Sequence, residues 1–207
     1  MTAARDVLAA MSRAALRGTS EASALDATLH RRAKNAAQGK RAKENGDRYE
    51  RAVYATYDDM VRDGVLASWD HYGPKTKHIS AREVVVTGNA PVDIVGYTRE
   101  GYTYAAEVKH GDKVYVRADP PRSTDRKARV EEHQRAELDA VDRTTHGTAE
   151  LVVMVRGVCA IIPWREVSQR AWLTVTDVRA YLAALADDDA QSVWCKRLRR
   201  AAEREGL

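Results

Sequence analysis

The sequence has little cysteine and no long apolar run. Its 207 residues include two cysteines, Cys159 and Cys195, and these form no CxxC motif. Two separate cysteines cannot supply a cysteine-rich zinc site or a disulfide framework, so we expect the protein in a reducing cytoplasm. The longest aliphatic run, Leu151 to Val155, is far shorter than the roughly 18–20 apolar residues of a membrane-spanning helix. A membrane partner is therefore not expected.

The charge of the chain is modest in total but uneven along the sequence. Lys and Arg number 34 against 30 Asp and Glu, a net charge of +4. Residues 1–46 carry +5 and residues 194–207 carry +3, which leaves −4 for the interval between them. Basic ends around an acidic centre fit a protein that binds a polyanion at a carboxylate-rich site. Solvated helix surfaces would give the same pattern.

The first third of the chain predicts helices joined by polar connections. An amphipathic pattern at the start is followed by a predicted loop at residues 18–23, and a second short helix is expected from about Ala24. Residues 30–48 are basic and polar with little to bury, which is typical of an arm or a surface connection. Apolar positions from Tyr49 to Val61 recur at helical spacing before Gly64, and they predict the first core helix.

Beyond this helix the pattern predicts strands and then an alternation of helices and strands. Residues 70–80 contain turn and basic residues and predict a loop. β-Branched and aromatic residues then predict a meander of strands, followed by helix, strands and further helices. The expected strands are 82–88, 91–97, 102–110, 149–157 and 158–164, and the expected helices are about 130–142, 174–186 and 191–204. This order indicates an α/β fold with a mixed central β-sheet flanked by helices.

The turn at residues 99–101 sets the register of one predicted hairpin. A three-residue hairpin loop commonly ends with glycine, here Gly101, because its last position needs a left-handed backbone conformation. If Thr98 and Tyr102 close the loop, facing residue numbers sum to 200 and Asp93 lies opposite Glu107. A loop of two or four residues would move Asp93 off the face of Glu107.

In this register two carboxylates and Lys109 share one strand face. Asp93 and Glu107 would have Cβ atoms roughly 4.5–5.5 Å apart, and such a like-charge pair destabilises a sheet unless it is compensated. Mg²⁺ would compensate it, because this hard cation takes oxygen ligands and retains several waters. Lys109 would then polarise a water or stabilise phosphate charge. The alternative is an exposed strand face with ordinary surface ion pairs.

Two helical residues add to this group. Glu50 lies beside the apolar stripe of its predicted helix, so its carboxylate would reach the sheet edge; a solvated glutamate is the alternative. Gln134 occupies an apolar position in the stripe Val130, Gln134, Leu138 and Val141. A buried amide needs hydrogen-bond partners. A reaction centre would supply them, and neighbouring backbone groups are the alternative.

The chain resembles the PD-(D/E)xK nuclease superfamily in an ordered set of five residues. The set comprises Glu50 in GDRYERAV, Asp93 in PVDIVGY, Glu107 and Lys109 in YAAEVKH, and Gln134 in EEHQRAEL. More narrowly, the chain is similar to the RecU-type Holliday junction resolvases of bacteria and phages, over about residues 40–168. The resemblance implies a restriction-endonuclease-like core. It also implies Mg²⁺-dependent hydrolysis of DNA phosphodiesters by a homodimer, which leaves 5′-phosphate and 3′-hydroxyl ends.

The resemblance also implies a role for each residue of the set. Asp93, Glu107 and the Val108 carbonyl would hold Mg²⁺, for which Mn²⁺ would substitute, and no organic cofactor is implied. Lys109 would position or activate the attacking water. The remaining two residues of the set would assist, Glu50 by supporting the metal shell and Gln134 by orienting water or phosphate. A phage-encoded relative would act in the cytoplasm of its host.

The resemblance divides the chain into a basic helical arm (1–45), a nuclease core (46–168) and C-terminal helices (169–207) that pack on the core or at a dimer interface. Several cations would hold DNA through its phosphates, and they are Lys40, Arg41, Lys43, Lys75 and Lys77. In resolvases of this branch a basic stalk precedes the active-site Asp, whereas the stretch 73–90 is short here. A four-way junction is the expected substrate. The alternatives are a related nuclease acting on flaps, forks or duplex DNA, and a DNA-binding module that does not cleave.

Overall fold

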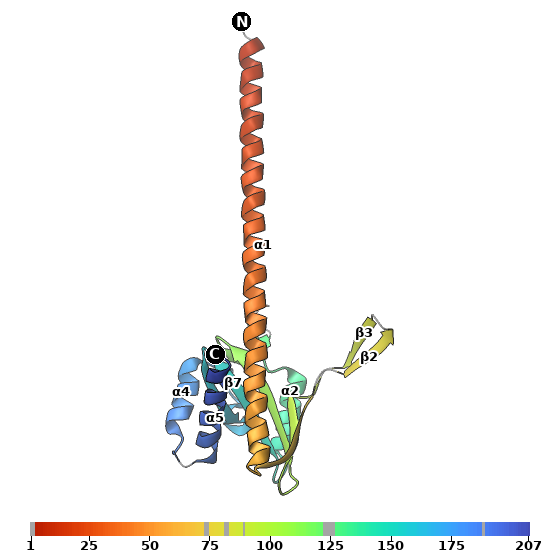
Figure 1. The fold of residues 1–207 in the computed structure, drawn as a ribbon, viewed down its shortest axis with the longest axis vertical. Helices are drawn as coiled ribbons and strands as arrows, with labels where there is room; N and C mark the ends of the chain where they lie inside the picture. Colours follow the sequence, from red (N-terminus) through yellow and green to blue (C-terminus); the bar gives the residue numbers. More distant parts are fainter. Residues whose placement is uncertain (1–2, 73–74, 81–82, 89, 122–126, 188) are drawn as a thin grey trace. The chain divides into compact units, whose positions relative to one another are not determined.

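The computed structural model describes residues 3–72, 75–80, 83–88, 90–121, 127–187 and 189–207 (Figure 1). Side chains are described from Thr28 onward, except for residues 29, 32, 33, 75–80 and 83–88. The chain forms two compact units, Met1–Asn45 and Gly46–Leu207. Within the described ranges, none of the helices combines the length and the apolar character needed to cross a membrane.

The first element, α1 (Ala3–Arg62), is one helix of 60 residues. The loop predicted at residues 18–23 is therefore wrong, and residues 30–48 continue the same helix. Alanine, arginine, lysine, glutamate and leucine are strong helix formers, and an interior glycine costs only about 1 kcal/mol. The first proline of the chain is Pro74, beyond the end of the helix. Helix propensity thus outweighs the turn signal that Gly18 and its neighbours give.

The last part of α1 is the core helix that the sequence predicts. Tyr49, Val53 and Tyr57 are completely buried along one stripe. After Arg62 the backbone turns at Gly64, which has φ +73° and donates its N–H to the carbonyl of Val61 at 3.0 Å. A left-handed glycine at this position ends a helix without the steric cost that other residues would pay. The predicted core helix and its stop signal are confirmed.

A mixed five-stranded sheet forms the centre of the second unit, with strand order β1-β4-β5-β7-β8. Its strands are β1 (Leu66–His71), β4 (Ile94–Thr98), β5 (Thr103–Gly111), β7 (Thr148–Val155) and β8 (Val158–Pro163). β5 and β7 pair in parallel and are connected through α2 (Glu132–Asp142), while the other neighbours pair antiparallel. The predicted α/β class, with a mixed sheet flanked by helices, is confirmed.

The strand meander is corrected in one respect. β2 (Lys75–Ser80) and β3 (Glu83–Gly88) pair with each other in a separate two-stranded sheet, so the strand predicted at 82–88 does not join β4. The loop predicted at 70–80 is also wrong, because it contains β2 and the end of β1. β1 lies at the sheet edge, and Leu66 is its only buried residue. An edge strand of this kind lacks the apolar alternation that marks strands in a sequence.

The remaining elements complete the second unit. They are β6 (Val114–Tyr115), α3 (Trp164–Val167), β9 (Trp172–Leu173), α4 (Val175–Ala184) and α5 (Ala190–Arg204). β6 and β9 form a second small sheet. The two C-terminal helices agree with the sequence prediction, whereas the two-residue strands and the four-residue helix are too short to give a periodic signal.

The two faces of the central sheet carry different polar groups. Glu150 pairs with Ala106 and therefore shares a face with Tyr104. α1 and α5 lie on this face, because Tyr57 Oη is 2.7 Å from Tyr104 Oη and Gln191 donates to Glu150 at 3.1 Å. Glu107 follows Ala106 in the strand and so projects from the opposite face.

Candidate active site

The β4–β5 hairpin has the register predicted from its turn. Ile94 faces Ala106, and facing residue numbers sum to 200 along the whole pairing. Gly101 has φ +84°, as the last position of the predicted three-residue loop requires. Asp93 lies immediately before β4, and this register brings it across from Glu107. The prediction that these two carboxylates meet across the hairpin is confirmed by their contacts.

Asp93 and Glu107 are joined through each other's backbone. The Asp93 N–H donates a hydrogen bond to Glu107 Oε2 at 3.2 Å. In return, the Val108 N–H next to Glu107 donates to Asp93 Oδ2 at 3.0 Å. One oxygen of each carboxylate is engaged in this way, and Asp93 Oδ1 and Glu107 Oε1 take no part in these two bonds. The reciprocal bonds hold the two carboxylates beside each other at the end of β4.

Lys109 lies beside this pair in a buried position. Its Nζ is 2.6 Å from Glu107 Oε1, and Glu107 and Lys109 are 0% and 9% exposed. The contact is a short-range ion pair, although no described donor is aligned for a hydrogen bond to this oxygen. The alternative reading of the sequence, an exposed strand face with surface pairs, is therefore wrong. The covering elements come from elsewhere in the chain, which is why the strand sequence alone did not reveal the burial.

Burial dominates the protonation of Glu107. Its pKa is raised to about 8, chiefly by desolvation, which the charge of Lys109 opposes and the charge of Asp93 reinforces. Burial thus favours the protonated form of this carboxyl, because the charged form is costly in a buried site, and the ion pair with Lys109 forms when the proton is lost. A metal cation that binds the carboxylate would displace that proton, so binding would strengthen as the pH rises.

Glu50 lies on α1 close to the same pair. Its pKa is raised first by desolvation, then by the charges of Asp93 and Asp47, while His71 lowers it. The side chain belongs to an exposed residue, so the carboxylate stays accessible to water. The predicted proximity of Glu50 to the sheet edge is consistent with its electrostatic coupling to Asp93.

Gln134 is buried as the apolar stripe predicts, at 9% exposure. Its Oε1 accepts a hydrogen bond from the Glu131 N–H at 2.8 Å, which forms part of the capping box at the start of α2. The alternative of the sequence analysis, an amide satisfied by neighbouring backbone, thus holds for its oxygen. Its Nε2 donates to no described residue, and Gln134 forms no bond with Asp93, Glu107 or Lys109, all of which the structure describes.

The donor atoms present suit a hard divalent cation. In the described part of the chain, no group of three or more His, Cys, Asp and Glu side chains gathers around one point. Two carboxylates remain, Asp93 and Glu107. The N–H and C=O of one strand residue point to the same edge, so the Val108 carbonyl faces the same side as Asp93. Mg²⁺ usually binds through one or two carboxylates and keeps several waters. The poorly satisfied Glu107 Oε1 fits such an ion.

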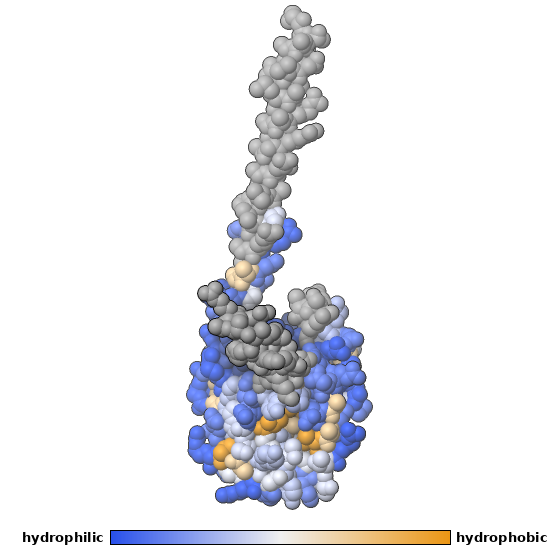
Figure 2. All heavy atoms as spheres, turned by 90° about the vertical axis from the view of Figure 1, so that its right-hand side faces the viewer, coloured by the Kyte–Doolittle hydropathy of each residue, from blue (hydrophilic) through white to orange (hydrophobic). Residues whose placement is uncertain are grey.

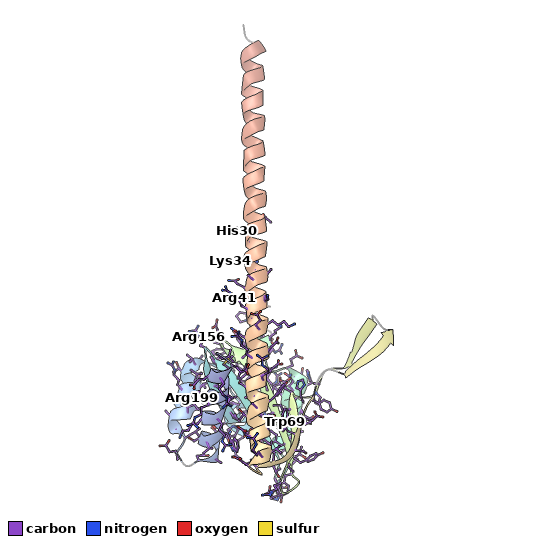
Figure 3. The ribbon with its side chains drawn as sticks, in the orientation of Figure 1. His30, Lys34, Arg41, Trp69, Arg156 and Arg199 are labelled. Carbon is purple, nitrogen blue, oxygen red and sulfur yellow. The ribbon has the colours of Figure 1, made fainter. Side chains whose placement is uncertain are left out.

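The cations predicted to contact DNA lie on two elements. Lys40, Arg41 and Lys43 are exposed on α1, and Figure 3 labels Arg41 there. Lys40 Nζ is 3.9 Å from the Glu44 carboxylate, an exposed pair of a kind that contributes little to stability. Lys75 and Lys77 fall in β2, where side chains lie outside the described residues.

One strand that borders the site, β1, was not predicted from the sequence. The Tyr72 N–H, which follows β1, donates to the Asp93 carbonyl at 2.9 Å. This bond places the end of β1 beside the candidate site, where His71 lowers the pKa of Glu50. At the other side, His133 Nε2 lies 3.0 Å from the carbonyl of Ala90 and ties α2 to the segment before Asp93. The sequence of β1 has no periodic apolar pattern, so the position of His71 and Tyr72 beside the site could not be predicted from it.

Comparison with known proteins finds no matching family model and no similar curated protein. The candidate site therefore stands on its own geometry. The likeness to PD-(D/E)xK nucleases remains a prediction from the sequence.

Proposed function

We propose that this protein is a metal-dependent DNA endonuclease of the PD-(D/E)xK type. One observation carries the proposal: Asp93 and Glu107 bond to each other's backbone across a hairpin, and Lys109 lies buried 2.6 Å from Glu107. Buried ion pairs contribute little net stability, so a fold that required only a stable sheet has no reason to keep these charges there. The mixed sheet flanked by helices supports a restriction-endonuclease-like core.

The residues of the site would divide the work of phosphodiester hydrolysis. Asp93, Glu107 and the Val108 carbonyl would hold Mg²⁺, or Mn²⁺ in its place. The bound metal would lower the pKa of a water ligand and offset charge on the phosphate. Lys109 would orient the attacking water and stabilise the negative charge that develops in the transition state. Gln134 would use its free Nε2 to bind water or a phosphate oxygen.

Within this class we propose a four-way DNA junction as the substrate and a homodimer as the active form. The exposed cations Lys40, Arg41 and Lys43 support binding to nucleic acid, because such contacts follow the phosphate backbone without reading its sequence. The preference for junctions over other branched DNA derives from the resemblance to RecU-type resolvases. A nuclease that cuts flaps, forks or duplex DNA is the second candidate, because the same site chemistry would serve it.

The proposal is tested by incubating the full chain with end-labelled DNA of four forms. These are a four-way junction, a Y-fork, a flap and a linear duplex, each with Mg²⁺, with Mn²⁺ or with chelator. We expect paired, symmetric nicks in the junction with either metal and none with chelator. If linear duplex is cut as well as the junction, the junction-specific proposal is wrong and the second candidate, a nuclease of broader substrate range, is favoured. Binding without cleavage of any form would contradict the nuclease proposal.

A further inference from the structure

The solvent side of α5 is densely basic. Its cations are Lys196, Arg197, Arg199, Arg200 and Arg204, and Glu203 is the single acidic residue of the helix. The opposite side of the helix is buried in the core through Trp194, Leu198 and Ala201. Figure 3 labels Arg199, whose side chain belongs to an exposed residue. The helix thus uses one side for packing and offers positive charge on the other.

Two of these cations have no side-chain partner in the part of the protein that the structure describes. Lys196 pairs with Asp187 at 2.8 Å, and Arg197 pairs with Asp63 at 2.7 Å. Arg199 lies 3.7 Å from Glu203. By contrast, the side chains of Arg200 and Arg204 form no ion pair or hydrogen bond with any residue that the structure describes. Their charges are therefore available to an external anion.

The unpaired arginines belong to a regular row that continues onto α1. Lys196, Arg200 and Arg204 recur every four residues, which spaces them about 6 Å apart along the helix. Arg48 of α1 lies next to the end of this row, close to Gly206. A Cβ placed on Gly206 would be 3.7 Å from Nη1 of Arg48. We call these four residues, Arg48, Lys196, Arg200 and Arg204, the α5 surface.

The chemistry of the α5 surface favours a phosphate backbone. Arginine presents a planar fork of donors that matches phosphate oxygens, and three of the four residues are arginines. An anionic membrane is a poorer match, because interfacial helices need an apolar face to bury in the lipid. The apolar face of α5 is already packed in the core, and Val193 is its exposed large apolar residue. Figure 2 shows a different face of the molecule, where hydrophilic residues surround a few hydrophobic ones.

The α5 surface and the Glu107 and Lys109 side chains of the candidate site lie on opposite sides of the central sheet. Gln191 of α5 donates to Glu150, which shares a sheet face with Ala106. Glu107 is the next residue along β5 and projects from the other face. A straight duplex that meets Glu107 from that face would have the sheet between itself and the α5 surface.

We propose that the α5 surface binds a second DNA duplex segment, distinct from the segment that is cut. This inference rests on the proposed function, because it takes DNA as the ligand of the candidate site. A branched DNA molecule can offer one arm to each surface. Two linked contacts raise the apparent affinity above that of either alone, so branched DNA is bound more tightly than linear duplex.

The test removes the two unpaired arginines from the full-length chain. The variant Arg200→Gln/Arg204→Gln loses no described ion pair, and Arg200→Lys/Arg204→Lys keeps the charge. Arg165→Gln/Arg179→Gln is the matched control, since it removes two exposed arginines from α3 and α4. Fluorescence anisotropy measures binding of a four-way junction and of a linear duplex of equal length in chelator, over a series of salt concentrations. Circular dichroism verifies the fold of each variant.

For the glutamine variant we expect a junction affinity that falls on the order of tenfold and a plot of log affinity against log salt that becomes shallower by about 2. The preference for junction over duplex should shrink in step. The lysine variant should retain most of the affinity, and the control should match the wild type.

Three results would overturn the inference and leave the proposed function standing, and a fourth would overturn both. An unchanged affinity and salt slope in the glutamine variant would remove the α5 surface as a DNA contact. An equal loss for junction and duplex would show one shared binding mode instead of two segments. A loss of binding to phosphatidylserine vesicles, with DNA binding intact, would assign the surface to a membrane. If the wild type itself binds no DNA, the proposed function fails as well.

Discussion

The backbone amide of Asp93 donates a hydrogen bond to the carboxylate of Glu107 at 3.2 Å. The opposing carboxylate, that of Asp93, accepts from the amide that follows Glu107 at 3.0 Å. Two facing carboxylates would repel each other in an ordinary sheet. Here each one accepts a hydrogen bond from the backbone of the opposite strand. The distance between the two carboxylates is therefore set by the hairpin register and not by flexible side chains.

Replacing Asp93 tests the metal chemistry separately from DNA binding. In Asp93→Asn the amide oxygen still accepts from Val108, so the fold is expected to persist. Cleavage should fall roughly a thousandfold or more, because metal polarisation is worth several kcal/mol. Binding of junction DNA in chelator should remain, since no phosphate-binding cation is lost. Gel assays of cleavage and anisotropy measurements of binding check both, and a parallel loss of both would contradict the assignment.

The pKa of Glu107 sets a pH dependence for the metal-free protein. Its folded pKa is about 8, against an ordinary value of 4.5. Between these values the folded protein holds a proton that the unfolded chain has released, so the free energy of unfolding falls as the pH rises through this window. Urea unfolding in chelator at pH 5, 6.5 and 8 should show a smaller fall in Glu107→Gln than in the wild type. Identical slopes in the two proteins would refute this.

On the other sheet face, Tyr104 connects two buried groups. Its hydroxyl lies 2.7 Å from Tyr57 Oη and also donates to the buried carboxyl of Glu150, whose pKa burial raises. Tyr104→Phe removes both bonds, and we expect a loss of about 1–3 kcal/mol in the free energy of unfolding. Tyr57→Phe removes one bond and should cost about 0.5–1.5 kcal/mol. Urea titrations measure the difference; a larger cost for Tyr57→Phe would be inconsistent with this arrangement.

Gly96 allows β1 to approach β4. A Cβ at this position would lie 2.5 Å from the Ser68 carbonyl oxygen and 3.2 Å from Trp69 Cα, which are backbone atoms that cannot move aside freely. We expect Gly96→Ala to lower the free energy of unfolding by about 1–3 kcal/mol, as overpacking does. Gly101→Ala meets no atom within 4 Å but must hold φ +84°, so it should cost about 1–2 kcal/mol. Thermal melts of both variants measure the two losses of stability, which arise from a steric clash in Gly96→Ala and from backbone strain in Gly101→Ala.

The parts of the fold that local chemistry determines were predictable. The glycine at the end of the three-residue loop set the register, and that register placed Asp93 opposite Glu107. The buried strand β7 and the helix α2 follow from apolar runs and helical spacing. Such features depend on residues near one another in the chain, which is where sequence patterns carry their information.

The parts that depend on distant contacts were not predictable. The burial of Glu107 and Lys109 comes from elements that pack over β5. β1 is a polar edge strand, and its position next to Asp93 follows from its antiparallel pairing with β4 and from the backbone bond at Tyr72. For Gln134 the sequence left two kinds of partner open, because the capping box that engages its oxygen is completed by Glu131 and not by serine or threonine.

Strand β5 presents Tyr104 to one side of the sheet and Glu107 and Lys109 to the other. Neighbouring strand residues alternate between faces, so inserting a single residue into β5 between Tyr104 and Glu107 would exchange the faces on one side of the insertion. Either Glu107 and Lys109 would then face Tyr57 and Glu150, or Tyr104 would face Asp93. The number of residues between Tyr104 and Glu107 is therefore constrained by the contacts on both faces of the sheet. Natural variation in chain length should accumulate in the neighbouring connections and leave these few residues untouched.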